Sequence, residues 1–370
     1  MQNGEHDYIL YGTPASPTQV ESFLSHMFKS NDEAEANGKR KTPICIWGKH
    51  GIGKTELVEA YAANNGYQFA YIAPAQFEEM GDLIGMPSLV NGKTEFAPPK
   101  WVPASKGPGI LLIDDLNRAD DRILRGLMQL FQVYSLSSWS LPPQWQIVAT
   151  ANPDGGDYSV TPLDDAMITR MMHITMKFDL IEWSMWAENQ GIDQRGIQFV
   201  LSRPGIFTEN RTTPRTLVQF FDAIKSIDDL ESNANMVQLL ADACLTPSTT
   251  GEFWDFVTND LKILIGPEEI LATNDFETEI LPKIMDEKSD LKLKNDQLFT
   301  IMARLSNHLN VNPEPLSEMA KKNLERFITL PALPADLRLG FARRLSSTKN
   351  PAIKEIFLNP QIGSLLLSGL

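Results

Sequence analysis

The sequence Gly48-Lys49-His50-Gly51-Ile52-Gly53-Lys54-Thr55 decides the class of fold. It fits the pattern G-x-x-x-x-G-K-[ST], follows an apolar run at residues 44–47 and precedes a helix-forming stretch that starts at Glu56. Glycines in such a loop let backbone N–H groups point at phosphate oxygens, and the helix N-terminus adds positive potential. We therefore expect this loop and Glu56 to bind a nucleotide, with Lys54 at the β- and γ-phosphates and the Thr55 hydroxyl on Mg²⁺. The alternative is a glycine-rich turn without a ligand, which the flanking elements disfavour.

Two carboxylates follow a second apolar run. Residues 110–113 read Ile-Leu-Leu-Ile, and Asp114 and Asp115 come directly after them. Ligands of α/β sheets bind at the carboxyl ends of the strands, so this position predicts a role at the nucleotide. Asp114 is the expected Mg²⁺ partner, through water, and Asp115 is placed to polarise the attacking water. Without the nucleotide-binding loop, two solvated aspartates opening a loop would be an equal alternative.

Apolar runs and helical periods alternate from residue 43 to about residue 178. Runs of this length, at residues 44–47, 69–72, 110–113 and 147–150, are typical of strands covered by helices on both faces. They predict an α/β domain with a mostly parallel sheet. Upstream, the apolar spacing predicts a short helix over residues 19–28 and a solvated loop over residues 30–41. Downstream of residue 178 only helical periods remain.

Composition excludes several other classes of protein. A chain of 370 residues that is 42% apolar can bury a core in two or three domains. The net charge of −14 repels a polyphosphate backbone, so nucleic acid is not an expected partner. Cys45 and Cys244 lack paired spacing, which disfavours disulfides and thiolate zinc sites. Because we find no apolar run long enough to span a membrane and no signal-peptide pattern in the first seven residues, we expect a cytoplasmic protein.

Together these motifs resemble those of MoxR-type AAA+ ATPases over residues 10 to 230. Residues 48–55 are similar to a Walker A motif and residues 111–115 to a Walker B motif. Asp115-Leu116-Asn117-Arg118-Ala119 resembles the D-E-I-N-R-A signature of that family. Here Asp115 replaces the usual catalytic glutamate and is one methylene shorter. We therefore expect slow hydrolysis without a loss of nucleotide binding.

Two further residues carry the resemblance within the α/β region. Asn152 follows the apolar run 147–150 and is similar to sensor 1, whose amide would contact the γ-phosphate or the attacking water. Arg170 ends the segment 163–170, which resembles the one that carries an arginine finger, so it would reach a neighbouring subunit's nucleotide. The plainer alternatives are an asparagine that caps a turn and an arginine that pairs with Asp164 or Asp165.

Two more arginines are candidates for the same chemistry. Thr213-Pro214-Arg215-Thr216 predicts a helix start, with Thr213 as the cap and Pro214 in the first position. The segment resembles sensor 2, in which Arg215 would face the γ-phosphate. An ordinary first-turn arginine is the alternative. Arg118 is a second candidate for a contact across a subunit boundary.

Two segments are candidates for contact with a partner. The pair Asn91-Gly92 between β-forming residues predicts a hairpin, which is either the helix-2 insert of the MoxR family or a decorative hairpin. Residues 133–145 match the place of a pre-sensor-1 hairpin and contain Tyr134, Trp139 and Trp145. These aromatic residues would grip a polypeptide or, more commonly for tryptophan, lie in the core.

The resemblance implies a P-loop AAA+ core whose mostly parallel sheet is flanked by helices. We expect an N-terminal helix and polar loop joined to the core at residues 1–42, the core at 43–178, a helical lid at 179–262 and a helical region of unassigned role at 263–370. It also implies ATP and Mg²⁺ as cofactors, and hydrolysis at sites shared between the subunits of a ring, expected to be a hexamer.

The resemblance further implies a chaperone-like action that remodels or assembles a partner protein complex. MoxR relatives often act with proteins that contain a von Willebrand factor A domain, so such a partner is implied here. Two alternatives stay open at this point. One is an ATP-gated scaffold with weak hydrolysis, and the other is a clamp-loader-like remodeller of nucleic acid.

Overall fold

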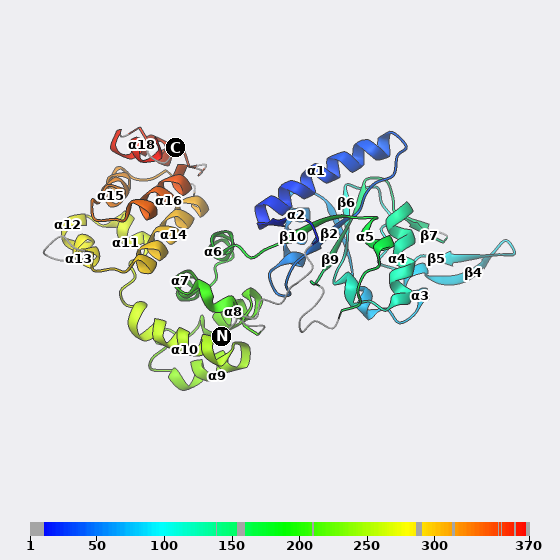
Figure 1. The fold of residues 1–370 in the computed structure, drawn as a ribbon, viewed down its shortest axis with the longest axis horizontal. Helices are drawn as coiled ribbons and strands as arrows, with labels where there is room; N and C mark the ends of the chain where they lie inside the picture. The colour runs from blue at the N-terminus through cyan, green and yellow to red at the C-terminus, as the bar shows by residue number, and fades with distance from the viewer. Residues whose placement is uncertain are drawn as a thin grey trace. The chain divides into compact units, whose positions relative to one another are not determined.

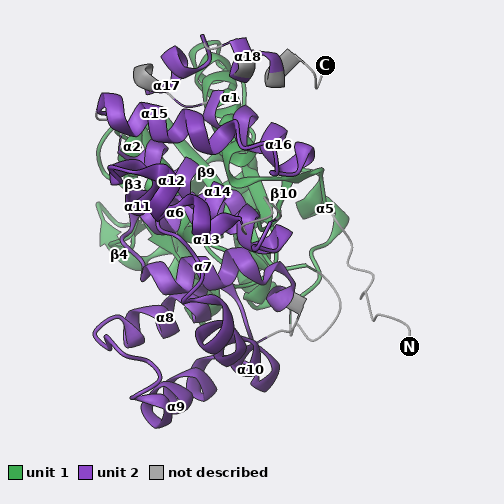
Figure 2. Ribbon diagram, turned by 90° about the vertical axis from the view of Figure 1, so that its left-hand side faces the viewer, with its two compact units in different colours: residues 1–179 green, residues 180–370 purple. Residues whose placement is uncertain are grey.

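The protein is described here by a computed structural model. It divides into two compact units, residues 1–179 and residues 180–370 (Figure 2). Within its described residues, we find no helix that is both long and apolar enough to cross a membrane. The start of the expected N-terminal segment, residues 1–10, lies outside the described part. The structure describes residues 11–137, 139–153, 160–208, 211–285, 291–312, 315–346, 348, 350–358 and 360–367.

Unit 1 is built on a six-stranded sheet in which all neighbouring strands are parallel (Figure 1). The apolar runs of the sequence form its central strands, which are buried along their whole length. This confirms the predicted α/β class with a parallel sheet. In spatial order the strands are β1 (Pro14–Ala15), β10 (Met172–Met176), β2 (Ile44–Trp47), β9 (Trp145–Ala151), β6 (Gly109–Ile113) and β3 (Gln68–Ile72).

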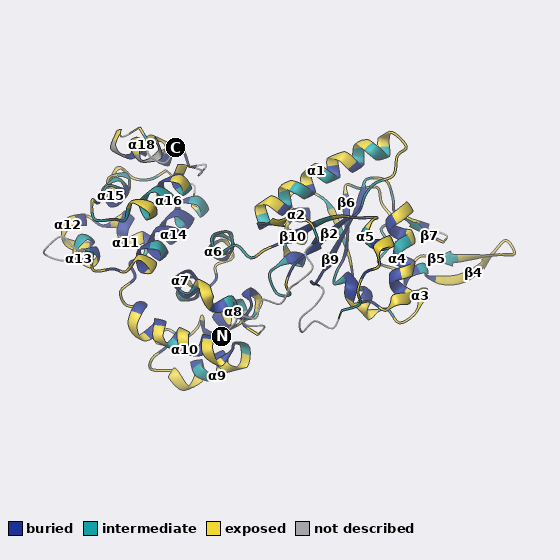
Figure 3. Ribbon diagram, viewed as in Figure 1, coloured by how far each residue is buried: buried dark blue, intermediate teal, exposed yellow. Residues whose placement is uncertain are grey.

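Helices cover both faces of this sheet, because successive strand residues point to opposite sides. Ile44 and Ile46 pack with buried residues of α1 (Pro17–Ala36) and α2 (Lys54–Asn64). Cys45 and Trp47 belong to the opposite cluster, which contains the apolar face of α4 (Asp121–Val133). The buried strands between the helices are visible as dark blue in Figure 3.

The expected solvated loop over residues 30–41 was wrong for its first half, because α1 continues to Ala36. Asn31 is buried on this helix, and its Nδ2 donates to the carbonyl of Thr42 and to Oε1 of Gln146, each over 2.9 Å. The stretch Glu33-Ala34-Glu35-Ala36 also has high helix propensity. Tertiary hydrogen bonds therefore extend a helix whose apolar spacing stops earlier.

Unit 1 contains two antiparallel hairpins. The predicted hairpin is confirmed as β4 (Met86–Val90) paired antiparallel with β5 (Lys93–Ala97), where Asn91 and Gly92 have φ of 52° and 74°. The second joins β7 (Ser135–Leu136) to β8 (Trp139–Ser140). Around it Tyr134, Trp139 and Trp145 are buried in the core, as the plainer alternative predicted. Shorter elements are η1 (Pro74–Gln76), α3 (Met80–Ile84), η2 (Leu116–Arg118) and α5 (Asp165–Ile168).

The described part of unit 2 is helical, which agrees with the predicted helical C-terminal half. Its elements are α6 (Leu180–Asn189), α7 (Gln194–Ser202), η3 (Pro204–Thr208), α8 (Pro214–Ile224), α9 (Ala234–Cys244), α10 (Pro247–Asp255), η4 (Phe256–Asp260), α11 (Pro267–Ala272), α12 (Phe276–Glu279), α13 (Leu281–Ile284), α14 (Asn295–Val311), α15 (Glu318–Ile328), α16 (Ala335–Ser346), α17 (Pro351–Ile356) and α18 (Pro360–Leu367).

Contacts in unit 2 run across the expected boundary between residues 262 and 263. The α14 helix packs against α6 and α7. The amide of Asn307 donates to the Ser184 hydroxyl over 2.8 Å, and Gln297 donates to Asp260 over 2.9 Å. The division of this unit into a lid and a separate C-terminal region stays a prediction.

Candidate nucleotide site

The predicted phosphate loop lies between β2 and α2, at the carboxyl edge of the sheet. Gly51 and Gly53 have φ of 70° and 94°, a backbone region that side chains disfavour. At Gly48 crowding decides instead, because an added Cβ would lie 2.8 Å from the carbonyl oxygen of Met176. These positions need glycine for the loop to curl before the first turn of α2.

Lys54 begins α2 and is buried inside this loop, with only 6% of its surface exposed. Its Nζ donates to the carbonyl oxygens of Gly48 (2.7 Å) and Lys49 (3.0 Å) and to Oδ1 of Asn152 (3.2 Å). Neutral oxygens thus hold a buried ammonium group at the mouth of the loop. Such a group favours an anion, because charge interactions strengthen away from bulk water.

Three further residues that the sequence predicts to contact a nucleotide lie close to Lys54 along the chain. His50 lies in the turn of the loop, and Ile52 packs against the cluster beneath α1 and α2. Glu56 lies in the exposed first turn of α2, where a negative charge complements the helix dipole. Their predicted contacts with a nucleotide stay predictions.

The carboxylate of Asp114 comes directly after β6 and is surrounded by hydroxyl groups. Its Oδ1 accepts hydrogen bonds from Thr55 Oγ1 (2.8 Å) and Thr150 Oγ1 (2.6 Å). Its Oδ2 accepts one from the Tyr71 hydroxyl (3.1 Å). Burial, together with the nearby Asp114 carboxylate, raises the pKa of Tyr71. Sequence reasoning assigned Thr55 and Asp114 to one metal but missed Thr150 and Tyr71.

Asp115 lies at a sharp turn of the backbone, with φ of 50° and ψ of 47°. This left-handed conformation is uncommon outside glycine, although aspartate and asparagine tolerate it best. Asp115 Oδ1 accepts from Nδ2 of Asn152 over 2.9 Å, and its Oδ2 lies 3.2 Å from Nε of Arg118. The turn thus directs Asp114 toward Thr55 and Asp115 toward Asn152.

Asn152 follows β9 and has no exposed surface. Asn117 holds its backbone at two points, donating to the Asn152 carbonyl over 2.8 Å and accepting from the Asn152 N–H over 3.0 Å. The Asn152 side chain is therefore free to bond Lys54 and Asp115. The topology explains this convergence, because β9 lies between β2 and β6 and their carboxyl ends meet there.

Arg170 lies just beyond α5, whose N-terminus is capped by Asp164 accepting from the Met167 N–H over 2.7 Å. The Arg170 guanidinium donates to the carbonyl of Ala166. Across the described ranges, no ion pair joins Arg170 to Asp164 or Asp165, which was the plainer alternative. Its predicted reach to a neighbouring subunit stays a prediction.

Sequence reasoning missed a link between this segment and the strand before the phosphate loop. Trp47 Nε1 donates to Nδ1 of His173 over 2.9 Å, so the proton of a neutral ring lies on Nε2. That nitrogen lies 2.8 Å from the carbonyl oxygen of Ile168, two residues before Arg170. The ring therefore ties the end of α5 to β2.

Arg215 is exposed in the first turn of α8. The predicted helix start is confirmed, since Pro214 begins the helix and the Thr213 hydroxyl accepts from the Thr216 N–H over 3.2 Å. Arg215 belongs to unit 2, whereas the other site residues belong to unit 1. Its sensor role stays a prediction.

The donors near the loop fit Mg²⁺ better than a metal held by protein alone. No cluster of three or more His, Cys, Asp or Glu side chains suited to a metal is found in the described residues. Mg²⁺ typically takes one or two carboxylates and completes its shell with phosphates and water. Asp114 and the Thr55 hydroxyl supply that kind of donor set beside a phosphate-binding loop.

Comparison with known proteins shows a family similarity for the region that contains the candidate site. Residues 43–171, about a third of the chain, match the family model described as AAA domain (dynein-related subfamily). This region is therefore similar to AAA domains, a class of P-loop domains that in general binds nucleotide with Mg²⁺ and hydrolyses ATP.

The curated relatives match this chain over short stretches. Midasin from Giardia intestinalis is 27% identical over 139 residues, which is 36% of this chain and 3% of midasin. BssE from Thauera aromatica, which is named as a chaperone, is 30% identical over 98 residues, which is 26% of this chain and 34% of BssE. The chain therefore spans a minor part of both relatives.

Solved structures with a detectable likeness include variants of RuvB from Thermotoga maritima. A variant in which glycine replaces a proline is 14% identical, with a TM-score of 0.40 over 73% of this chain and 89% of that chain. A variant in which arginine replaces a lysine is 15% identical, with a TM-score of 0.38 over 61% of this chain and 69% of that chain.

Proposed function

We propose that this chain is a MoxR-like AAA+ ATPase that hydrolyses ATP with Mg²⁺ and uses the cycle to remodel or assemble a partner protein complex. The observation that carries the proposal is the convergence of the ends of β2, β6 and β9 at the predicted phosphate loop. There Asn152 bridges Lys54 and Asp115 at 3.2 and 2.9 Å, and Thr55 bonds Asp114 at 2.8 Å.

In this proposal the loop N–H groups bind the β- and γ-phosphates and Lys54 neutralises part of their charge. Thr55 and Asp114 hold Mg²⁺, which when bound neutralises charge that develops on the phosphate oxygens. The Thr55 hydroxyl donates a hydrogen bond to Asp114. The lone pairs of the Thr55 oxygen therefore stay available to the metal.

Asp115 orients the attacking water in this proposal, and Asn152 holds that carboxylate in place. Both Asp115 oxygens already have partners, Asn152 Nδ2 on one and Arg118 Nε on the other. The Arg118 pair is the weaker one, since both side chains are well exposed at 45% and 37%. Release of Arg118 therefore frees one oxygen for water.

The remaining parts of the proposal concern assembly. Arg170 completes a neighbour's site in a ring, proposed to be a hexamer, and Arg215 reaches the γ-phosphate from unit 2. A protein with a von Willebrand factor A domain is the proposed kind of partner. The likeness to BssE, which is named as a chaperone, supports a chaperone-like action.

The experiment is ATP turnover per protomer over a wide range of protein concentration, with Lys54→Ala as the blank. Turnover that rises with concentration and then saturates supports sites completed between subunits. Turnover equal to the blank at every concentration contradicts an autonomous ATPase.

A second candidate function is an ATP-gated scaffold with weak hydrolysis. It is favoured by the short Asp115 side chain, both oxygens of which are engaged. Asp115→Glu separates the two candidates. A large rise in turnover supports the scaffold, whereas a fall indicates that aspartate is adapted to this left-handed turn.

A further inference from the structure

Thr150 lies on β9 and has no exposed surface, and its hydroxyl makes two hydrogen bonds inside the site. It donates to Oδ1 of Asp114 over 2.6 Å and accepts from the backbone N–H of Asp115 over 2.9 Å. One side chain thus bonds the carboxylate of one residue and the backbone of the next.

The two bonds act on different features of the site. Asp114 Oδ1 is held between two hydroxyls, one from Thr55 on the phosphate-loop helix and one from Thr150 on the central strand. The second bond stabilises the left-handed turn at Asp115, a conformation that costs energy for a residue with a side chain. The position is available because β9 lies directly between the strands that precede both motifs.

We propose that Thr150 is a positioning residue for the Mg²⁺ site. It fixes the rotamer of Asp114 so that the carboxylate meets Thr55, and it holds the turn that separates the directions of Asp114 and Asp115. The inference rests on the proposed function. It adds to that function a residue that lies outside both the phosphate loop (residues 48–55) and the acidic strand end (residues 111–115).

A purely structural explanation makes a different prediction. Threonine suits a buried strand because its branched side chain packs well, and valine has nearly the same shape. In Thr150→Val the packing stays, but Asp114 loses a donor and the Asp115 N–H loses its acceptor. Thr150→Ser keeps the hydroxyl and removes only a methyl group.

The test measures the affinity of the full chain for a fluorescent ATP analogue, once with Mg²⁺ and once with EDTA. The ratio of the two affinities is the Mg²⁺ gain. We expect Thr150→Val to lower this gain about tenfold, the size of one hydrogen bond to a charged group, and Thr150→Ser to stay within about twofold of wild type.

The matched control is Thr175→Val on β10, which β2 separates from β9 in the sheet. Thr175 is also buried, and its hydroxyl donates to the carbonyl of Tyr11 over 2.8 Å. This control removes a buried strand hydroxyl without touching either carboxylate, so its Mg²⁺ gain should match that of wild type.

Each other outcome is decisive. An unchanged Mg²⁺ gain in Thr150→Val overturns the inference and leaves the proposed function standing. This includes the case in which affinity falls equally with and without Mg²⁺. If the wild-type chain binds no nucleotide, both fail. If Thr150→Val does not fold, Thr150→Ala and Thr150→Ser are compared, and an equal Mg²⁺ gain in these two variants overturns the inference.

Discussion

The side-chain amide of Asn152 connects Lys54 to Asp115, accepting from the Lys54 ammonium at its oxygen and donating to the Asp115 carboxylate at its nitrogen. The two partners fix the orientation of the amide, because an ammonium only donates and a carboxylate accepts. Lys54 belongs to the phosphate loop and Asp115 to the end of β6. One buried amide therefore makes the position of the Asp115 carboxylate depend on the predicted phosphate loop.

We predict that Asn152→Ala lowers the rate of ATP hydrolysis about 100-fold, the usual cost of one precisely oriented polar group. ATP affinity should change much less, because Lys54 keeps its two carbonyl partners. Single-turnover hydrolysis and equilibrium binding of ATP measure the two effects separately. An Asn152→Ala variant that loses affinity but hydrolyses at the wild-type rate would assign the amide to binding alone.

The sequence predicts the residues at the strand ends of this site better than it predicts those beside them. Asp115 and Asn152 each follow an apolar run, so the carboxyl-edge rule finds them. From the sequence alone, Thr150 cannot be distinguished from any other β-branched residue of a strand. Its place beside Asp114 follows only once the order of the strands is known. A weak signal exists, because Thr150 and Asn152 are polar residues at period two within an apolar stretch.

The same limit applies to the fold. Apolar runs and the Asn91-Gly92 pair predict the parallel sheet and one hairpin, because these are local patterns. The last turns of α1 depend on distant partners, since Asn31 bonds a strand residue 115 positions away. Local pattern cannot reveal such a contact, so the helix was predicted too short.

Arg170 provides the sharpest test of shared sites. We predict that Arg170→Ala lowers turnover at least about 10³-fold, with nearly unchanged ATP affinity. Mixing it with Lys54→Ala should restore activity, because some sites then combine an intact Lys54 with a neighbour's intact Arg170. For random assembly of an equal mixture, about a quarter of the sites are complete.

The control for this experiment is Arg125→Ala, an exposed arginine of α4 that pairs with Asp121. It should keep wild-type turnover. An Arg170→Ala variant that is fully active, or a mixture that stays inactive although both variants assemble, would contradict a finger supplied between subunits.

The end of α1 predicts a dependence of stability on pH. Burial opposes the charge of Glu35, but hydrogen bonds from Lys41 Nζ (2.6 Å) and the Gln144 N–H (2.8 Å) lower its pKa below the ordinary value. A carboxyl group whose pKa is lower in the folded state than in the unfolded state stabilises the fold. This stabilisation is fully present at pH values above the unfolded-state pKa, near 4.5. That stabilisation is lost as the pH falls through the folded-state pKa.

We therefore predict that Glu35→Gln lowers the melting temperature at pH 7 and that its difference from wild type shrinks as the pH falls below about 4.5. Thermal unfolding from pH 3 to pH 7 measures this. Glu33→Gln, an exposed position of the same helix, should follow the wild-type curve. A difference that is constant over this range would show that the charge of Glu35 does not act.

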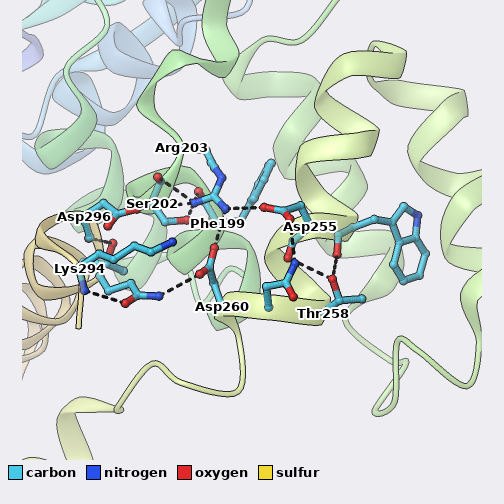
Figure 4. Close-up of polar contacts among 12 residues, drawn as sticks. Phe199, Ser202, Arg203, Asp255, Thr258, Asp260, Lys294 and Asp296 are labelled. Atoms are coloured by element: carbon cyan, nitrogen blue, oxygen red, sulfur yellow. Dashed lines mark hydrogen bonds and ion pairs between the residues drawn. The ribbon is translucent and has the colours of Figure 1, made fainter. Parts of the chain in front are cut away.

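We expect the ion pair between Arg203 and Asp260 to contribute strongly to the stability of unit 2. It follows α7, and its Nη2 donates to Asp260 over 2.5 Å and to Asp255 over 2.9 Å (Figure 4). Asp260 also accepts from Gln297 on α14, so the cluster joins the end of α7 to α10, η4 and α14. Burial opposes the charge of Arg203, but its bonds to Asp260 and Asp255 raise its pKa.

Removing one member of such a pair leaves the other charge buried, and Arg203 and Asp260 expose only 20% and 9% of their side chains. We predict that Asp260→Ala lowers the free energy of unfolding of unit 2 by about 2 to 3 kcal/mol. The double variant Arg203→Met with Asp260→Leu should recover most of this loss, because it removes both charges and restores apolar contact.

The control is Glu277→Ala, which breaks the exposed ion pair with Arg326 and should cost less than about 1 kcal/mol of stability. Hydrogen exchange of the η4 and α14 amides reports this locally, and protection in Asp260→Ala equal to that in Glu277→Ala would contradict the prediction.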